Sequence, residues 1–455
     1  MDLRTKQILV VGLGETGWAT ARYLKKSGAC VRVTEQANTP QLQEKARRLK
    51  EQGIEVELGQ HTEGFVRDSD LVVTSPGVPP ESLPLKLALA AGKPVWSEVE
   101  IAWRLSPTRK VIAVTGTNGK TTTTSLLGFL LKQCRWPHLI CGNIGNPFIG
   151  ELDKLTADTW VVLEVSSFQL EYIEQFKPLV GVLLNITPDH LDRYPSFEEY
   201  ALTKLRLFSR QGEEDWAVIN HDDVFCFSRS QHISSRKLFF SLIPGKADLW
   251  YERESIWLKQ PVKQEVCSLR GANLFGTGNL QNMLAVAGVS LILRIGRGVL
   301  EKTLQDFRPL AHRMEKVADI NGVSFVNDSK STNVDSVRKA LETFAPGSVI
   351  LIMGGKDKGF SFAELCPLVK EKVSYLLLLG ETAKKIAADL EASGVRVEFV
   401  SSLSEAVQKG YQQARPGKTV LLSPGCSSFD MFTNYKERGD VFKKTVQALL
   451  SAVRG

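Results

Sequence analysis

The chain has few cysteines, and none of them is placed for a disulfide framework or a metal cluster. Its seven cysteines form no CxxC pair and have no metal-ligand spacing, so we expect reduced thiols. The sequence also lacks any apolar run of membrane-spanning length, and the short apolar run of its N-terminus is not an export signal. We therefore expect a cytoplasmic protein with no membrane partner.

Concentrated positive charge is also missing. The formal net charge is +7, but Lys and Arg are dispersed, and the nearest approach to a cluster is KARRLK at residues 45–50. This distribution favours small anionic substrates and argues against a nucleic-acid partner. With 455 residues, 43% of them hydrophobic and 24% charged, the chain can bury substantial cores and suggests about three domains.

Strands alternate with helical patterns along three segments, which indicates an α/β fold. Residues 1–96 begin with the strand QILVV, residues 97–310 contain KVIAV, TWVVLEV, LVGVLLNI and WAVIN, and residues 311–455 open with the NG-turned hairpin VADINGVSFVND. A β-rich excursion is expected at residues 237–270. We predict a Rossmann-like N-terminal domain, a central mostly parallel sheet of P-loop ATPase type, and a Rossmann-like C-terminal domain.

The first segment carries a dinucleotide-type fingerprint. GLGETG, residues 12–17, follows a strand and opens a helix, and Glu35 ends the next strand. Glycines of this kind let the backbone approach a diphosphate, and the acidic residue can bind a ribose. The match is compatible with NAD, with another diphosphate-bearing nucleotide, or with a tight turn that binds nothing.

The middle segment contains TGTNGKTT after the strand KVIAV and before a helix. Backbone N–H groups of residues 117–120 would face phosphates, Lys120 would reach the β and γ oxygens, and the Thr121 hydroxyl would bind Mg²⁺. Val114 stands where a general P-loop has glycine. The predicted phosphate-binding residues are Gly116, Thr117, Asn118, Gly119, Lys120, Thr121 and Thr122.

Polar side chains follow several of the predicted strands. Glu164 ends VVLEV, Asp189 and His190 follow LVGVLLNI, and Asn143 lies in the Gly-rich turn CGNIGNP. Ligand groups collect at the carboxyl ends of parallel strands, so Glu164 and His190 become candidate Mg²⁺ ligands. Taken singly, Glu164 could form a buried ion pair and His190 could start a helix.

A helix is predicted over SFEEYALTKLRLF, residues 196–208, with a capping box formed by Ser196 and Glu199. Lys204 lies inside this helix. From the sequence pattern alone, Lys204 is a solvated or ion-paired lysine.

These motifs together resemble one known family. TGTNGKTTT, GNIGNP, EVSSFQL, NITPDHLDRY, YALTKLRLF, AHRME, NDSKSTN and LLSPGCSSFDMF occur in the order found in Mur ligases. The resemblance covers essentially the whole chain, and the P-loop of that family is itself similar to TGTNGKTT, which accounts for Val114. The form of the last motif resembles that of the members that add D-glutamate to UDP-N-acetylmuramoyl-L-alanine. The DNPR-like string of the members that add a diamino acid is absent from the sequence.

The resemblance implies an ATP-dependent amide ligase of peptidoglycan precursor synthesis. In this family the γ-phosphate of ATP is transferred to a carboxylate of the UDP-linked substrate, and an amino group attacks the resulting acyl phosphate. By resemblance, Thr121 and Glu164 bind one Mg²⁺ and His190 binds a second. Lys204 corresponds to a lysine that is carbamylated and becomes a ligand of the second metal, which requires a neutral amine first. Lys120, Glu164, His190 and Lys204 are thus the expected catalytic residues.

The resemblance also assigns the remaining binding residues. The first domain is implied to bind UDP in place of a dinucleotide, and the matching substrate positions are Thr16, Glu35, Gln36, Gly77, Asn143 and Ser166. Asn279 is implied to contact adenine, although Gly278 replaces the histidine of the family's His-Asn pair. The ATP contacts implied in the third domain are Arg313, Asp328 and Lys330, of which Asp328 and Lys330 could merely pair with each other. The implied D-glutamate contacts are Thr332, Lys358, Ser428 and Tyr435.

Other functions stay open at this point. A different Mur ligase or a folylpolyglutamate synthase shares the TGTNGKTT loop and the carbamylated lysine, although the UDP-type first domain argues against folate. A nicotinamide-dependent oxidoreductase would rest on GLGETG alone, and a nucleotide-binding regulator would hold ATP without an amino-acid substrate. We expect a monomer with ATP, UDP-N-acetylmuramoyl-L-alanine and D-glutamate as its small-molecule partners.

Overall fold

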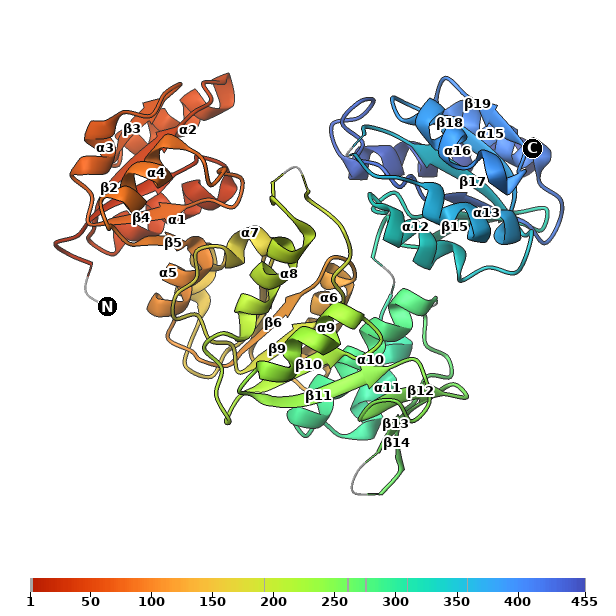
Figure 1. Cartoon of the computed structure of the whole chain (residues 1–455), viewed down its shortest axis with the longest axis horizontal. Helices are drawn as coiled ribbons and strands as arrows, with labels where there is room; N and C mark the ends of the chain where they lie inside the picture. The colour runs from red at the N-terminus through yellow and green to blue at the C-terminus, as the bar shows by residue number, and fades with distance from the viewer. Residues whose placement is uncertain are drawn as a thin grey trace. The chain divides into compact units, whose positions relative to one another are not determined.

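A computed structural model describes residues 3–191, 193–259, 262–274, 276–308, 310–357 and 359–454. The chain divides into two compact units (Figure 1). The first unit comprises Met1–Leu269 and Asn282–Thr303, and the second comprises Arg270–Gln281 and Leu304–Gly455. No helix in the described part of the chain combines the length and the apolar character needed to cross a membrane.

The first of three sheets is wholly parallel, with strand order β3-β2-β1-β4-β5. Its strands are β1 (Gln7–Val11), β2 (Cys30–Glu35), β3 (Glu55–Leu58), β4 (Leu71–Thr74) and β5 (Val95–Ser97). The helices among and after them are α1 (Glu15–Lys26), α2 (Pro40–Lys50), α3 (Glu63–Arg67), α4 (Leu83–Ala90) and α5 (Glu98–Leu105). Strands such as LVVT are buried throughout because helices cover both faces. A Cβ at Gly17 would clash with the carbonyl oxygen of Gly12, so the fingerprint glycine lets α1 pack closely on the turn.

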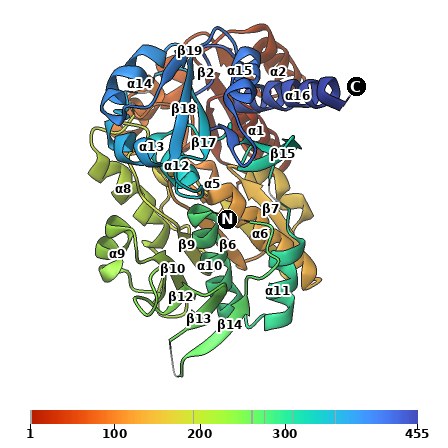
Figure 2. The same cartoon turned by 90° about the vertical axis from the view of Figure 1, so that its right-hand side faces the viewer.

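The second sheet has the order β14-β13-β12-β11-β10-β9-β6-β8-β7. Its strands are β6 (Val111–Thr115), β7 (His138–Gly142), β8 (Trp160–Glu164), β9 (Val180–Leu183), β10 (Trp216–Asn220), β11 (Arg236–Ser241), β12 (Leu249–Glu252), β13 (Ser255–Leu258) and β14 (Gln264–Ser268). The sheet is parallel up to β12, and β12, β13 and β14 pair antiparallel. Figure 2 shows the hairpin of β13 and β14 at the edge of this sheet, where the sequence predicts a β-rich excursion.

The helices of the middle segment lie between and after these strands. They are α6 (Lys120–Gln133), α7 (Ser167–Leu170), α8 (Phe197–Leu205), α9 (Val224–Arg229), α10 (Thr277–Ile292) and α11 (Arg297–Asp306), with the 3-10 turns η1 (Phe148–Lys154), η2 (Arg206–Phe208) and η3 (Ser230–His232). Helix α10 packs closely on the sheet at Gly288, where a Cβ would meet side-chain atoms of Leu238 and Val218 at 3.0 and 3.1 Å.

The third sheet lies in the second unit and has the order β15-β16-β20-β17-β18-β19. Its strands are β15 (Glu315–Ile320), β16 (Val323–Asn327), β17 (Val349–Gly354), β18 (Val373–Leu379), β19 (Val397–Phe399) and β20 (Thr419–Leu422). Its helices are α12 (Val334–Leu341), α13 (Cys366–Lys372), α14 (Ala383–Asp389), α15 (Leu403–Gln413) and α16 (Tyr435–Arg454), with η4 (Ala363–Leu365) and η5 (Glu391–Ser393). Only β15 runs antiparallel, and it turns into β16 through Asn321 and Gly322, whose φ angles are 50° and 78°. The predicted NG hairpin is thereby confirmed.

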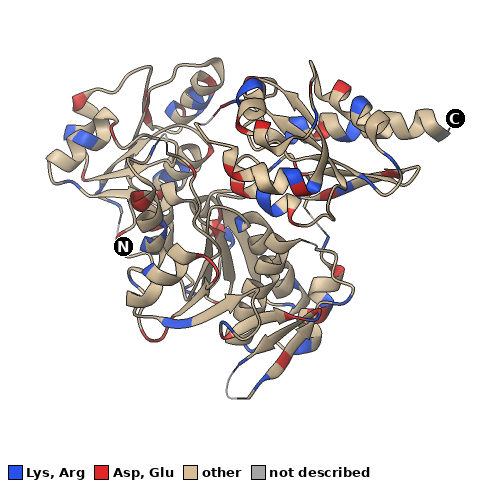
Figure 3. Ribbon diagram, turned by 45° about the vertical axis from the view of Figure 1, so that its right-hand side comes forward, with Lys and Arg blue, Asp and Glu red and all other residues tan. Residues whose placement is uncertain are grey.

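The three sheets confirm the predicted α/β class, whereas the domain boundaries at 96/97 and 310/311 stay predictions. One hydrophobic core joins the first sheet to the middle segment, since Leu13 and Ala21 belong to the same buried cluster as Phe148 and Ile149. Positive and negative residues are interspersed along the ribbon of each unit (Figure 3), as the dispersed charges of the sequence predict.

Candidate active site

The phosphate-binding loop follows β6 and is held by the segment after the neighbouring strand β9. The Thr117 N–H donates to the Asn185 carbonyl at 2.9 Å, and the Asn118 N–H donates to Asn185 Oδ1 at 2.8 Å. Thr117 Oγ1 donates to the Thr187 carbonyl at 3.1 Å and accepts from its N–H at 3.0 Å. The loop geometry is therefore fixed by side chains and backbone more than 60 residues further along the chain.

Two loop positions require glycine. Gly116 and Gly119 have φ angles of 150° and 86°, a region that disfavours other residues. A Cβ at Gly119 would also collide with Asn282 Oδ1, which accepts a hydrogen bond from Thr123 Oγ1 at 3.1 Å. Asn282 of α10 thus packs against Gly119 and bonds to Thr123, and in this way supports the loop. The sequence pattern does not reveal this role.

Two lysines converge on one carbonyl of the loop. Lys120 Nζ donates to the carbonyl oxygens of Gly116 and Thr117 at 2.9 and 2.8 Å, and Lys204 Nζ donates to the Gly116 carbonyl at 3.0 Å. Lys204 is only 1% exposed, so the interpretation of this residue as a solvated lysine is wrong. Burial, reinforced by the charge of Lys120 and opposed by that of Asp189, lowers the pKa of Lys204 well below its ordinary value.

Glu164 ends β8, the other neighbour of the P-loop strand, and is 2% exposed. Its Oε1 accepts from Asn143 Nδ2 at 2.8 Å. Its Oε2 is buried and has no hydrogen-bond partner among the described residues. An unpaired carboxylate oxygen in a buried position is costly, and it marks a place where a cation fits.

His190 follows β9, so the structure brings it to the same edge of the sheet as Glu164 and the P-loop. Its φ angle of 55° is unusual for a non-glycine residue. The Nε2 atom lies 3.7 Å from Asp189 Oδ2, and the ring centre lies 4.8 Å from that of Phe168. Asp192 of the same motif falls outside the described residues.

A partly buried ion pair anchors the segment that carries His190. Arg193 Nε and Nη2 donate to the two carboxylate oxygens of Glu171 at 2.9 and 2.6 Å, and Nη2 also donates to the Val78 carbonyl at 2.9 Å. Tyr194 adds a hydroxyl bond of 2.7 Å to Glu171 Oε1. The guanidinium lies 4.3 Å from the ring centre of Phe168. One side chain thus joins the His190 segment to the loop after β4.

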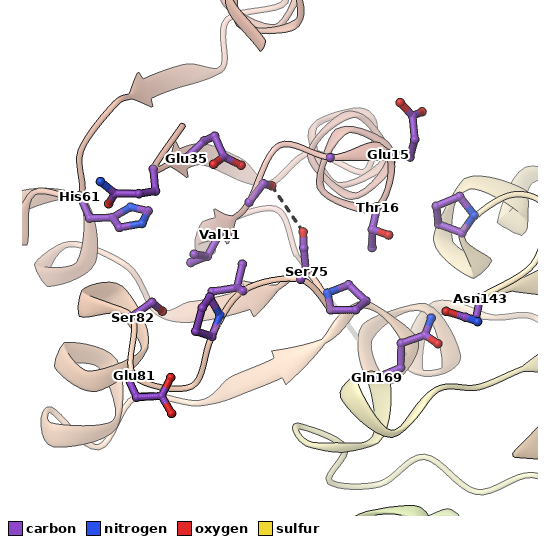
Figure 4. A pocket seen from close by; sticks show the side chains of 18 of the residues that line it. Val11, Glu15, Thr16, Glu35, His61, Ser75, Glu81, Ser82, Asn143 and Gln169 are labelled. Atoms are coloured by element: carbon purple, nitrogen blue, oxygen red, sulfur yellow. Dashed lines mark hydrogen bonds between the residues drawn. The ribbon is translucent and has the colours of Figure 1, made fainter. Parts of the chain in front are cut away.

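A cavity of about 1010 Å³ opens in the first unit at the carboxyl ends of β1, β2, β3 and β4 (Figure 4). The predicted substrate residues Thr16, Glu35, Gln36, Gly77 and Asn143 all line it. Figure 4 shows Glu35 and His61 at one end of the cavity and Asn143 with Gln169 at the other. The hydroxyl of the predicted Ser166 caps α7, where it accepts from the Gln169 N–H at 3.3 Å.

The second unit holds the other predicted residues. Asp328 is buried and accepts from the Met314 N–H at 3.1 Å and from Ser423 Oγ at 3.2 Å. Burial raises its pKa to about 7, although these hydrogen bonds and the Arg313 charge oppose the shift. Lys330 Nζ lies 4.2 Å from the ring centre of Tyr435.

Four further predicted residues belong to this unit. Ser428 is 2% exposed, and Thr332 is partly buried. Asn279 belongs to this unit, and next to it a Cβ on Gly278 would have ordinary contact with Lys339, at 3.6 Å from its Cδ. Lys358 falls outside the described residues.

Three family models match successive parts of the chain. A Mur ligase MurD-like N-terminal domain matches residues 6–97, a Mur ligase middle domain matches residues 114–290, and a Mur ligase glutamate ligase domain matches residues 312–426. The chain belongs to the Mur ligase family. The alternative of a nicotinamide-dependent oxidoreductase has no support. It does not explain the P-loop, Glu164 or the matched first domain.

Relatives align with nearly the whole length of this Mur ligase. It is 42% identical over 451 residues to the UDP-N-acetylmuramoylalanine--D-glutamate ligase of Koribacter versatilis, and 42% identical over 455 residues to the enzyme of that name from Caldicellulosiruptor bescii. In both comparisons the match covers 99% of each chain.

Solved structures share the fold at lower identity. The UDP-N-acetylmuramate-alanine ligase of Thermotoga maritima matches with a TM-score of 0.58 and 20% identity, over 98% of this chain and 100% of that one. The MurF ligase of Thermotoga maritima, solved with ADP, matches with a TM-score of 0.61 and 17% identity, over 98% and 96% of the two chains. The three-domain fold of this Mur ligase is thereby confirmed.

Proposed function

We propose that this Mur ligase joins D-glutamate to UDP-N-acetylmuramoyl-L-alanine at the expense of ATP, which becomes ADP and phosphate. The observation that carries the proposal is the 42% identity, over 99% of both chains, to enzymes named for that reaction. The matched N-terminal domain, which is of MurD-like type, supports the same choice within the family.

The P-loop supports ATP as the phosphate donor. Its backbone N–H groups precede α6, and the N-terminus of a helix favours anionic phosphate. Lys120 already lies over the loop, in contact with two of its carbonyl oxygens. An ammonium in this place neutralises part of the charge that otherwise keeps a carboxylate away from a triphosphate.

The residues around the loop fit Mg²⁺. The orphaned Oε2 of Glu164 is an oxygen ligand of the kind that Mg²⁺ prefers, and Thr121 offers a hydroxyl at the start of α6. Among the described residues, no group of three or more His, Cys, Asp and Glu side chains is placed to hold a metal, so phosphate oxygens would complete the ligand set. A bound Mg²⁺ supplies positive charge against the β and γ phosphates.

The reaction then has two chemical steps. The carboxylate oxygen of the alanyl group attacks the γ-phosphorus, the bond to the ADP oxygen breaks, and an acyl phosphate forms. The amino group of D-glutamate attacks the acyl carbon and loses a proton, the bond between that carbon and the phosphate oxygen breaks, and the amide and free phosphate are the products. We propose that Arg313, Asp328, Lys330 and Asn279 contact ATP, and that Thr332, Lys358, Ser428 and Tyr435 hold D-glutamate.

We propose that Lys204 is carbamylated and, with His190, binds a second Mg²⁺. A neutral amine is needed to attack CO₂, and a carbamate and a proton are the products; the burial of Lys204 and its lowered pKa favour that amine. Lys204→Ala is expected to lose ligation and to regain part of it with a short-chain carboxylate such as formate. Full activity of the variant without formate would contradict this role.

The same proposal includes a monomeric enzyme of the cytoplasm. Sedimentation equilibrium at micromolar concentration should give the mass of one chain, with or without substrates. A mass of two or more chains would contradict the monomer without affecting the reaction.

The decisive experiment measures phosphate release from ATP with UDP-N-acetylmuramoyl-L-alanine and one amino acid at a time: D-glutamate, L-glutamate, L-lysine or meso-diaminopimelate. We expect release with D-glutamate alone. Release with another amino acid would keep the ligase chemistry and reject the amino-acid assignment. No release with any of them would reject the ligase function.

A further inference from the structure

A chain of three hydrogen-bonded side chains ends at His61, which lines the cavity at its β2 and β3 end. Thr34 Oγ1 is 2.9 Å from Glu57 Oε1 and 2.7 Å from His61 Nδ1. Thr34 and Glu57 are paired in register across β2 and β3. Thr34 is 1% exposed, while His61 lines the cavity.

The proton of the Thr34 hydroxyl decides the tautomer of His61. Glu57 Oε1 also accepts from the Thr62 N–H at 2.9 Å, and a carboxylate can only accept, so Thr34 must donate to it. The carbonyl of Gln60, 3.3 Å away, is a further acceptor for the same proton. Since a hydroxyl has one proton, the short contact to Thr34 requires His61 Nδ1 to be the donor. Nε2 of the neutral ring is then a hydrogen-bond acceptor.

The burial of the ring favours the same neutral state. Burial lowers the pKa of His61, against the opposing charges of Glu57 and Glu35. Glu35 already accepts backbone hydrogen bonds on both oxygens, from Leu13 at 2.7 Å and from Ala37 at 2.9 Å. Its carboxylate therefore holds the Gly-rich turn in place.

The position of His61 in the cavity indicates which part of a bound substrate the side chain would contact. Asn143, at the opposite end, donates to Glu164 beside the P-loop, so the carboxylate that receives phosphate must lie at that end. The Gly-rich turn with Gly14 and Thr16 lies between and suits a diphosphate. The nucleoside of a UDP-linked substrate then extends to the end that holds His61.

We propose that His61 recognises the uridine end of the substrate by accepting, at Nε2, a hydrogen bond from a nucleoside N–H or O–H group. The donor is either the imide N–H of uracil or a ribose hydroxyl. The inference rests on the proposed function, because that function supplies the uridine diphosphate. His61 then determines specificity for the nucleotide, and Thr34 and Glu57 position it by fixing its tautomer.

The test uses the full-length enzyme, with His61→Phe and Thr34→Val as variants and His232→Phe, at an exposed histidine outside the cavity, as the matched control. Calorimetry measures the affinity for UDP, CDP and 2′-deoxy-UDP. Loss of one hydrogen bond in a site built for it should weaken UDP binding about tenfold in His61→Phe. The KM of the uridine substrate should rise about as much with kcat nearly unchanged, because the contact is equal in ground and transition states.

The competing nucleotides identify the donor. CDP lacks the imide N–H, so a wild-type preference for UDP over CDP that disappears in His61→Phe assigns the contact to uracil. A preference over 2′-deoxy-UDP that disappears instead assigns it to the ribose. Unchanged UDP affinity in His61→Phe overturns the inference, even if Thr34→Val fails to fold. If wild-type enzyme releases no phosphate with D-glutamate, the proposed function has failed, whereas His61 is refuted only through the nucleotide affinities.

Discussion

The partly buried ion pair of Arg193 and Glu171 gives a sharp test of how the His190 segment is held. Arg193→Met would keep the length of the apolar stem and remove all three donors to Glu171 and the Val78 carbonyl. Among the described residues, Glu171 would retain only the Tyr194 hydroxyl bond at 2.7 Å, although its side chain is just 10% exposed. A carboxylate in that position is left largely uncompensated.

Breaking one side of a fully buried pair costs about 3–5 kcal/mol, and we expect the lower end of that range here because the pair is only partly buried. For a unit of this size, a loss of about 3–5 kcal/mol corresponds to a fall of about 5–8 °C in the melting midpoint. Catalysis should fall as well at temperatures where the variant is folded, because His190 is held only three residues away. The double variant Arg193→Met with Glu171→Gln should recover part of the stability, since no buried charge remains unpaired.

Differential scanning calorimetry of the wild type, both single variants and the double variant measures these shifts. Arg47→Met is the control, because Arg47 forms ion pairs with Glu44 and Glu51 on the exposed face of α2 and should cost no more than about 1 kcal/mol. The reasoning is refuted if Arg193→Met melts like the control, or if the double variant is less stable than Arg193→Met alone.

The remaining predictions concern the two nucleotide-binding turns and one buried carboxyl. Gly17→Ala should shift α1 away from the Gly12 carbonyl and weaken UDP binding in calorimetry, while binding of an ATP analogue is retained. Lys120→Ala should lose phosphoryl transfer yet bind the uridine substrate normally, and a parallel fall in uridine affinity would contradict the assignment of the two sites. Glu98 is fully buried, and burial raises its pKa from 4.5 to about 7. The native state therefore binds more protons than the unfolded state between these values, and stability falls as pH rises through them, by at most about 3 kcal/mol. Denaturant titrations at pH 5 and pH 7.5 should show a smaller loss in Glu98→Gln than in the wild type, and the loss that remains in the variant includes that of Asp328, whose pKa is also raised to about 7.

Local patterns predicted most of the fold and the loop. The strands that precede GLGETG and TGTNGKTT, the helices that follow, and the NG hairpin all depend on residues close in sequence. The placement of Glu164 and His190 at one sheet edge was also predictable, because the carboxyl ends of parallel strands meet there. The predicted Mur ligase family is confirmed by the matches along the chain.

Contacts between distant segments were not predictable. The pattern of the helix around Lys204 does not show that its Nζ atom reaches the Gly116 carbonyl, 88 residues away in sequence. The hydrogen-bonded chain of Glu57, Thr34 and His61 depends on the register of β2 against β3. A register of this kind is set by the assembled sheet. Ligand contacts of the predicted residues stay predictions for the same reason.

The support that Asn282 gives the phosphate-binding loop has a consequence for the synthesis of the enzyme. The loop residues leave the ribosome early, but Asn282 leaves about 160 residues later. Until then Thr123 lacks its partner and the sheet lacks the cover of α10. A nascent chain therefore completes the support of its nucleotide loop only after more than half of its length has been translated.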